Sequence, residues 1–170
     1  MLYSKNKIIR TLGKTGFIQT LTLAVIITFL FSCSSNLVFR ENKHIAGEGW
    51  QPTDSVTFSF TVSDTLQPVD LFFNIRNTTA YSFQNLYFFI TTVYPGGDFS
   101  RDTAECILAA PDGKWLGKGS GHTRDSKFLF RKAVRFAKPG NYKLIVNQAM
   151  RDDLLKGISD VGLIIEKPNN

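Results

Sequence analysis

Histidine and cysteine, on which metal sites and nucleophilic catalysis most often depend, are scarce in this chain of 170 residues. The sequence contains two histidines, His44 and His122, and two cysteines, Cys33 and Cys106. Zinc sites and Ser-His-Asp triads draw on histidine, and two residues are too few for most such arrangements. Cys106 lies among apolar neighbours in AECILAA, so we interpret it as a small buried hydrophobe. We therefore predict that the protein binds no metal.

Motifs for phosphate binding and acid–base catalysis are also missing. The stretch GKWLGKGSG (113–121) lacks the GxxxxGK[ST] spacing of a phosphate loop, and no helical pattern follows it. Its glycines are better explained by a bulge or a long hairpin loop. Asp152 and Asp153 are adjacent and point in different directions on a helix, so they cannot flank one glycosidic bond. We predict no catalytic and no cofactor-binding residues, and a protein that is not an enzyme.

Acidic residues are absent before Cys33. Four basic residues precede it: Lys5, Lys7, Arg10 and Lys14. They are followed by the apolar run FIQTLTLAVIITFLF (17–31), which is shorter than the roughly 20 apolar residues of a membrane-spanning helix. A basic start, an apolar stretch and a small residue before the cut are typical of an export signal.

The four residues Leu30 to Cys33 (LFSC) resemble the lipobox of bacterial lipoproteins. In that motif the cysteine thiol takes a diacylglyceryl group, and cleavage leaves the cysteine as the new N-terminus. We therefore predict a signal peptide over 1–32 and a lipid anchor at Cys33, which makes membrane lipid a partner. An uncleaved N-terminal anchor helix is the alternative.

A strongly basic region for nucleic acid is missing once the signal is removed. The whole chain has 20 basic and 14 acidic residues, a net charge of +6. Removing the four basic residues of the signal leaves 16 basic and 14 acidic residues, a net charge of +2. The densest basic stretch, FRKAVR (130–135), alternates with apolar residues like a strand with a solvated face. We predict no nucleic-acid partner.

Helical periodicity is nearly absent from the mature chain, and period-two alternation dominates. In VTFSFTV (56–62) the apolar side chains alternate with Thr and Ser, as in a half-buried strand. Further strands are predicted in these segments: VDLFFNIRN (69–77), NLYFFITTVY (85–94), TAECILAA (103–110), KFLFRKAVRF (127–136), YKLIVNQ (142–148) and VGLIIEK (161–167). Gly/Pro turns separate them. The pattern predicts a single all-β domain, an antiparallel β-sandwich of the jelly-roll or immunoglobulin-like kind.

Two segments depart from that pattern. QAMRDDLLKG (148–157) places Met150 and Leu154 on one helical face, with Gly157 as a possible end. It predicts one short helix before the last strand. Residues 33–50 show weak periodicity and are interpreted as a lipid-anchored tether, which leaves 51–168 as the sandwich domain.

The sequence resembles the GldH-type gliding-motility lipoproteins of Bacteroidetes. The resemblance rests on three stretches: NIRNTTAYSFQNLYFFI (74–90), DGKWLGKGSG (112–121) and GNYKLIVNQAMRDDLLKGISDVGLIIEK (140–167). It implies an outer-membrane lipoprotein linked to gliding motility and to the associated type IX secretion system. The family has no established catalytic residues, so the resemblance carries over only Cys33, at the position of the lipid-bearing cysteine.

Two functions of different classes remain open. The first is a non-catalytic structural or assembly component that contacts other envelope proteins of motility and secretion. The second is a lipid-anchored carbohydrate-binding module, with a glycan platform formed by Trp50, Trp115, Tyr87 and Tyr94. In this bacterial group, surface-exported lipoproteins tend to carry acidic residues directly after the cysteine, whereas here the first acid is Glu41. We therefore expect a periplasm-facing protein under the outer membrane.

Overall fold

The computed structural model describes residues 36–168. These residues belong to the unit Asn36–Asn170. The predicted signal peptide and Cys33 lie outside the described residues. The described part contains no helix that is long and apolar enough to span a membrane.

Eight strands make up the domain, and they are all antiparallel to their neighbours. They are β1 (Leu37–His44), β2 (Val56–Val62), β3 (Val69–Thr78), β4 (Asn85–Val93), β5 (Phe99–Ile107), β6 (Thr123–Val134), β7 (Gly140–Gln148) and β8 (Ile158–Glu166). The bounds of β2 are those predicted from its alternation. The all-β, antiparallel fold class is confirmed.

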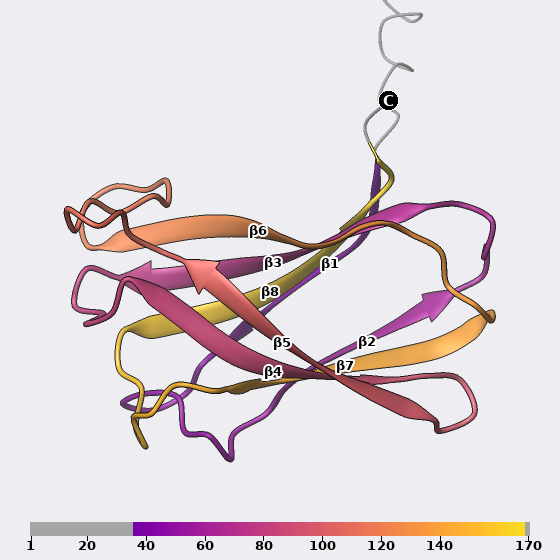
Figure 1. Cartoon of the computed structure of the whole chain (residues 1–170), viewed down its shortest axis with the longest axis horizontal. Helices are drawn as coiled ribbons and strands as arrows, with labels where there is room; N and C mark the ends of the chain where they lie inside the picture. The colour runs from indigo at the N-terminus through magenta and orange to yellow at the C-terminus, as the bar shows by residue number, and fades with distance from the viewer. Residues whose placement is uncertain (1–35, 169–170) are drawn as a thin grey trace, which may run out of the picture. The chain divides into compact units, whose positions relative to one another are not determined.

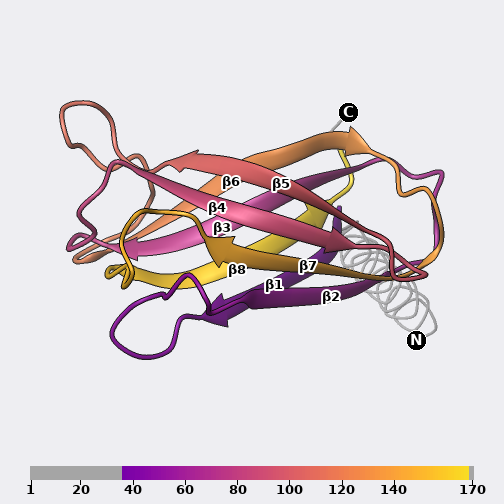
Figure 2. The ribbon, with the colours of Figure 1, turned by 60° about the horizontal axis from the view of Figure 1, so that its bottom comes forward.

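The strands form two four-stranded sheets, with the orders β1-β8-β3-β6 and β2-β7-β4-β5. Figures 1 and 2 show the two layers, with β8 between β1 and β3 in one and β7 between β2 and β4 in the other. Consecutive strands lie in opposite sheets, except for β4 and β5, which form a hairpin within one sheet. Eight strands arranged in two such sheets are the topology of a jelly roll. Connections between strands of different sheets must cross from one layer to the other, as the segments between β1 and β2 and between β5 and β6 do.

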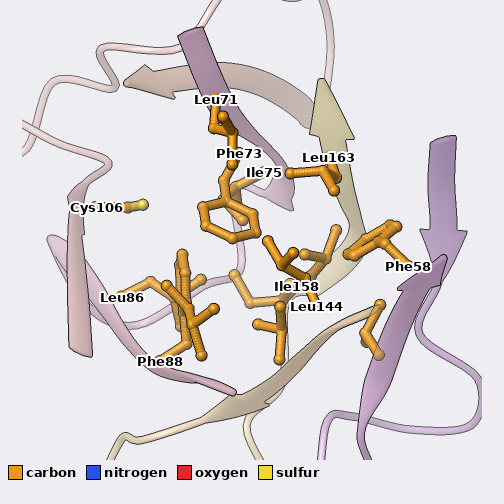
Figure 3. Packing of buried hydrophobic residues seen from close by; sticks show 14 of the residues in the cluster. Phe58, Leu71, Phe73, Ile75, Leu86, Phe88, Cys106, Leu144, Ile158 and Leu163 are labelled. Carbon is orange, nitrogen blue, oxygen red and sulfur yellow. The ribbon is translucent and has the colours of Figure 1, made fainter. Parts of the chain in front are cut away.

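The core fills the space between the sheets with side chains from alternate positions. Figure 3 shows Phe58 and Leu144 from one sheet converging on Phe73 and Leu163 from the other. The rings of Phe73 and Phe88 meet edge-on at 4.9 Å across the layers, a geometry that aromatic pairs favour. The alternation of apolar and polar residues in the sequence therefore corresponds to side chains that point alternately into and out of this core.

The predicted helix before the last strand is wrong. Residues 149–157 form bends, turns and one isolated bridge, in which Leu155 pairs with Trp50. Leu155 N–H donates to the carbonyl of Trp50 at 3.0 Å, and Trp50 N–H donates to that of Leu155 at 2.9 Å. The Gln148 side chain donates to the Asp152 carbonyl and accepts from the Met150 N–H, both at 2.8 Å. Trp50 and the Gln148 side chain thus take the backbone groups that helical hydrogen bonds would need.

The predicted tether over 33–50 is wrong from Leu37 onward. Residues 37–44 form β1, an edge strand that pairs with β8 from Leu37 beside Glu166 to His44 beside Asp160. The side chain of Trp50, the last residue of the predicted tether, is completely buried. An edge strand has one neighbour and a solvated side, so its alternation is weak and its sequence resembles a linker.

Candidate functional site

The outer side of the β1-β8-β3-β6 sheet carries a network of ion pairs, which we call the charged face. Arg76 donates to Asp125 at 2.8 Å and lies 3.8 Å from Asp160, which His44 approaches at 3.3 Å. The hydrogen bond to Asp125 is the main cause that raises the pKa of Arg76. On this face, acidic and basic groups neutralise one another.

A second group of pairs continues the charged face toward the start of β1. Glu166 accepts from Lys127 at 2.7 Å and lies 3.6 Å from Arg40. The Lys127 ammonium also lies 4.0 Å from the centroid of the Phe72 ring, within the range of a cation–π contact. All these groups are partly exposed, so each pair contributes little to stability.

The outer side of the β2-β7-β4-β5 sheet has a different composition, and we call it the aromatic face. Its outward positions are Thr57, Ser59, Thr61, Asn141, Lys143, Ile145, Asn147, Tyr87, Phe89, Thr91, Val93, Phe99, Arg101, Thr103, Glu105 and Ile107. Three of them are charged: Lys143, Arg101 and Glu105. Phe89, near the middle of β4, leaves 54% of its surface exposed.

The ends of β4 and β5 enlarge the aromatic face. Phe99 and Ile107, at the two ends of β5, are both exposed. Tyr87 lies opposite Glu105 on the neighbouring strand, and a hydrogen bond to Glu105 raises the pKa of Tyr87. Exposed apolar and aromatic side chains gathered on one sheet face are typical of an interaction surface.

The signal for the aromatic face was present in the sequence. NLYFFITTVY is apolar at successive positions, whereas a strand with one solvated face alternates. The structure buries Leu86, Phe88 and Ile90 and directs Tyr87 and Phe89 outward. Which residues join them from β7 and β5 depends on the strand order, and the sequence pattern does not contain that order.

The predicted glycan platform is not assembled. Trp50 lies in the core, where its indole N–H donates to the Asp54 carbonyl at 2.8 Å. Trp115 is half-buried and packs against the core. Tyr94 packs against Tyr142 and shares a hydrogen bond of 2.8 Å with Ser100. Only Tyr87 lies on the aromatic face, so the four residues do not form one surface.

Side chains of the types that catalysis and metal binding use have structural partners here. Asp102 accepts from Arg131 at 2.6 Å. His122 shares a hydrogen bond of 3.3 Å with Thr79. Within residues 36–168 no group of three or more His, Cys, Asp or Glu side chains could hold a metal ion.

Cys106 is buried, as predicted. Burial, with a smaller contribution from Glu105, raises the pKa of its thiol to about 12. A thiol with so high a pKa stays protonated and unreactive at neutral pH. Its role is therefore core packing.

The end of the sandwich at which β1 begins, which we call the proximal end, contains a hollow. The hollow has a volume of about 430 Å³ and lies beside the first residues of β1. Apolar side chains form most of its wall: Val38, Phe39, Phe60, Val62, Phe136 and Ile165. Asp64 and Lys167 contribute polar groups.

Comparison with known proteins identifies the family. The chain matches the GldH lipoprotein family over residues 37–165. It is 36% identical over 146 residues to the gliding motility lipoprotein GldH homolog of Christiangramia forsetii, covering 82% of this chain and 89% of the relative. It is 36% identical over 154 residues to the gliding motility lipoprotein GldH of Flavobacterium johnsoniae, covering 86% of this chain and 94% of the relative.

Similarity to solved structures is weaker. A family GH115 4-O-methyl-alpha-glucuronidase aligns with a TM-score of 0.41 and 12% identity, over 81% of this chain and 18% of that chain. A likeness at that level supports no conclusion about function. The family match covers most of the chain, and the two relatives agree with it. The chain belongs to the GldH lipoprotein family.

Proposed function

We propose that the protein is an outer-membrane lipoprotein, anchored through Cys33, that serves as a non-catalytic assembly component of the gliding-motility and type IX secretion machinery. Family membership and the names of the two relatives support the link to motility. The LFSC motif at 30–33 supports the lipid anchor. The protein acts through contacts with other envelope proteins.

The aromatic face is the observation that carries the proposal. It combines exposed Phe and Tyr with Thr and Asn and has few charges. The centres of protein interfaces are likewise enriched in aromatic residues and depleted of charged ones. On the charged face the ionic groups pair with one another. That face exposes fewer large apolar side chains than the aromatic face does.

The described acidic, histidine and cysteine side chains support a binding role over a catalytic one. Asp102, Asp125 and Asp160 pair with basic groups, and the Cys106 thiol is buried with a raised pKa. The carbohydrate-binding alternative loses its platform, because Trp50 is in the core.

Location in the inner leaflet of the outer membrane, facing the periplasm, is part of the proposal. Ser34, Ser35 and Asn36 follow Cys33, and the first acid is Glu41. No acidic export tag therefore adjoins the lipid-bearing residue.

Photo-crosslinking in cells tests the assembly role. A photoreactive amino acid is placed at position 89, on the aromatic face, and separately at position 129, on the charged face. Leu129 is a matched control, because it is 50% exposed and Phe89 is 54% exposed. We expect crosslinks to envelope proteins of motility or secretion from position 89 and few from position 129.

The Phe89→Glu and Leu129→Glu variants extend the test to isolated complexes. Phe89→Glu should reduce the envelope proteins that co-purify with the lipoprotein, whereas Leu129→Glu should not. Both should retain the parent melting temperature, because each side chain is exposed. Equal recovery of partners with both variants would contradict the role of the aromatic face.

A further inference from the structure

The first described strand begins close to the predicted lipid anchor. Residues 34–36 are the only ones between Cys33 and Leu37, where β1 starts. A chain spans at most about 3.6 Å per residue, so four residue steps reach no further than about 14 Å. If Cys33 carries lipid, the start of β1 must lie near the bilayer surface.

The strand register defines what else lies at the proximal end. Leu37 pairs with Glu166, Val62 with Gly140, and Val93 with Phe99. The loops that join the strands there are 63–68, 94–98 and 135–139. These three loops, with Leu37 and Lys167, make up the surface that lies nearest the anchor along the chain.

This surface presents apolar side chains to solvent. Leu66 is 81% exposed in the loop between β2 and β3, and Leu37 is 42% exposed at the start of β1. Core packing does not explain a leucine at position 66, because a side chain that stays exposed adds almost no hydrophobic stabilisation to the fold. The hollow of about 430 Å³ opens among apolar residues at the same end.

Hydrogen bonds hold the Leu66 loop in shape. The Asp64 carboxylate accepts from the N–H of Leu66 at 2.8 Å and from that of Gln67 at 3.3 Å. Arg135 of another loop donates from Nε to the Leu66 carbonyl at 3.0 Å. The loop therefore presents Leu66 with its backbone polar groups already partnered, which lowers the desolvation penalty of entering an apolar medium.

The charge of the proximal end is nearly balanced. Its basic residues are Arg135, Lys138 and Lys167, and its acidic residues are Asp64 and Asp98. Anionic lipid attracts basic clusters, and the attraction falls within a Debye length. With three basic groups against two acidic ones, binding by charge alone is weak, and the apolar side chains are the larger contribution.

We propose that the proximal end rests on the lipid bilayer that holds the anchor, with Leu66 inserted at the headgroup–acyl boundary. The inference rests on the proposed lipidation of Cys33. It assigns the membrane-facing surface to the three loops and leaves the aromatic face, whose strands run away from this end, accessible to protein partners.

Fluorescence quenching by lipid tests the proposal. A cysteine introduced at position 66 (Leu66→Cys) carries an environment-sensitive dye in the lipidated mature protein, reconstituted in phosphatidylethanolamine–phosphatidylglycerol vesicles. The control is Leu116→Cys, 57% exposed in the loop between β5 and β6 at the opposite end. Cys106 does not take the dye, because it is buried and its thiol has a pKa of about 12.

We expect a spin-labelled lipid to quench the dye at position 66 and to leave the dye at position 116 unchanged, with little effect of added salt. The intact mass of the same sample reports whether Cys33 is acylated. Acylated protein with equal quenching at both positions would overturn the membrane-facing surface and leave the proposed function standing. Protein that carries no lipid would overturn the anchor and this inference together.

Discussion

At the scale of single residues, a buried cysteine and a glycine with positive φ illustrate how individual positions serve the fold. Cys106 is buried and belongs to the hydrophobic core. Gly157 has a φ of +90° and packs against the backbone of Tyr81. Both residues serve the fold, and their roles can be measured separately from binding.

Cys106 should react with thiol reagents only when the domain unfolds. Its pKa is about 12 in the folded protein, against an ordinary value of 9.0. In a Cys33→Ser background, we expect the native protein to resist iodoacetamide at pH 8, and denaturant to make the thiol reactive. Rapid labelling without denaturant would contradict the burial.

The same pKa difference predicts how stability changes with pH. The raised folded pKa means that the protonated thiol is favoured by folding, and this contribution is fully present below pH 9. It should be lost as the pH rises from about 9 toward 12. Denaturant titrations of the Cys33→Ser protein and of the Cys33→Ser/Cys106→Ala protein, compared across that range, isolate the effect of the thiol.

Gly157→Ala should destabilise the domain more than Gly97→Ala. Both glycines have positive φ, +90° and +97°, and the left-handed region costs a residue with a Cβ about 1–2 kcal/mol. At Gly157 the added Cβ would also lie 2.7 Å from the Cα of Tyr81, whereas at Gly97 nothing lies within 4 Å. Thermal unfolding compares the two variants, and equal melting temperatures would contradict the close approach.

At the scale of elements, β1 and the segment 149–157 take their structure from distant partners. β1 pairs with β8, more than a hundred residues later in the chain. The segment 149–157 is held by the bridge between Leu155 and Trp50. β1 is an edge strand with one solvated side, so its alternation is weak although it pairs with β8 along most of its length. The bridge between Leu155 and Trp50 is a single pair and leaves no periodic pattern.

Removing β1 should unfold or aggregate the domain. A chain that begins at Ile45 exposes the edge of β8, and unpaired strand edges favour aggregation. A chain that begins at Asn36 is the control and should melt as the mature protein does. Circular dichroism during heating and size-exclusion chromatography measure the outcome. Equal melting temperatures of the two chains would show that residues 37–44 are not needed for the fold and would support the tether interpretation.

At the scale of the whole molecule, the jelly roll separates three surfaces. The charged face neutralises its own ions, the aromatic face exposes Phe89 and Phe99, and the proximal end adjoins the start of β1. Because the strands run from one end of the sandwich to the other, an attachment at the proximal end leaves both faces accessible. Under the two proposals above, the domain contacts the membrane at its proximal end and a protein partner through its aromatic face.

Protease added to intact cells tests the orientation of the whole domain. We expect the lipoprotein to resist digestion until the outer membrane is permeabilised, since the proposed orientation places the domain in the periplasm. A surface-exposed protein of the same cells serves as the positive control. Digestion before permeabilisation would place the domain outside.

The sequence by itself determined the strands, since period-two alternation is a local property that records which side of each strand faces the core. Seven strands and the burial of Cys106 follow from it, and β2 matches the predicted bounds at both ends. The tertiary structure alone decided the pairing order, the strand β1, the non-helical course of 149–157 and the composition of the aromatic face. Each of these depends on contacts between residues far apart in the chain, such as Trp50 with Leu155. A local pattern indicates which segments form strands and which of their side chains are buried. The packing of the two sheets decides which strands and side chains contact one another.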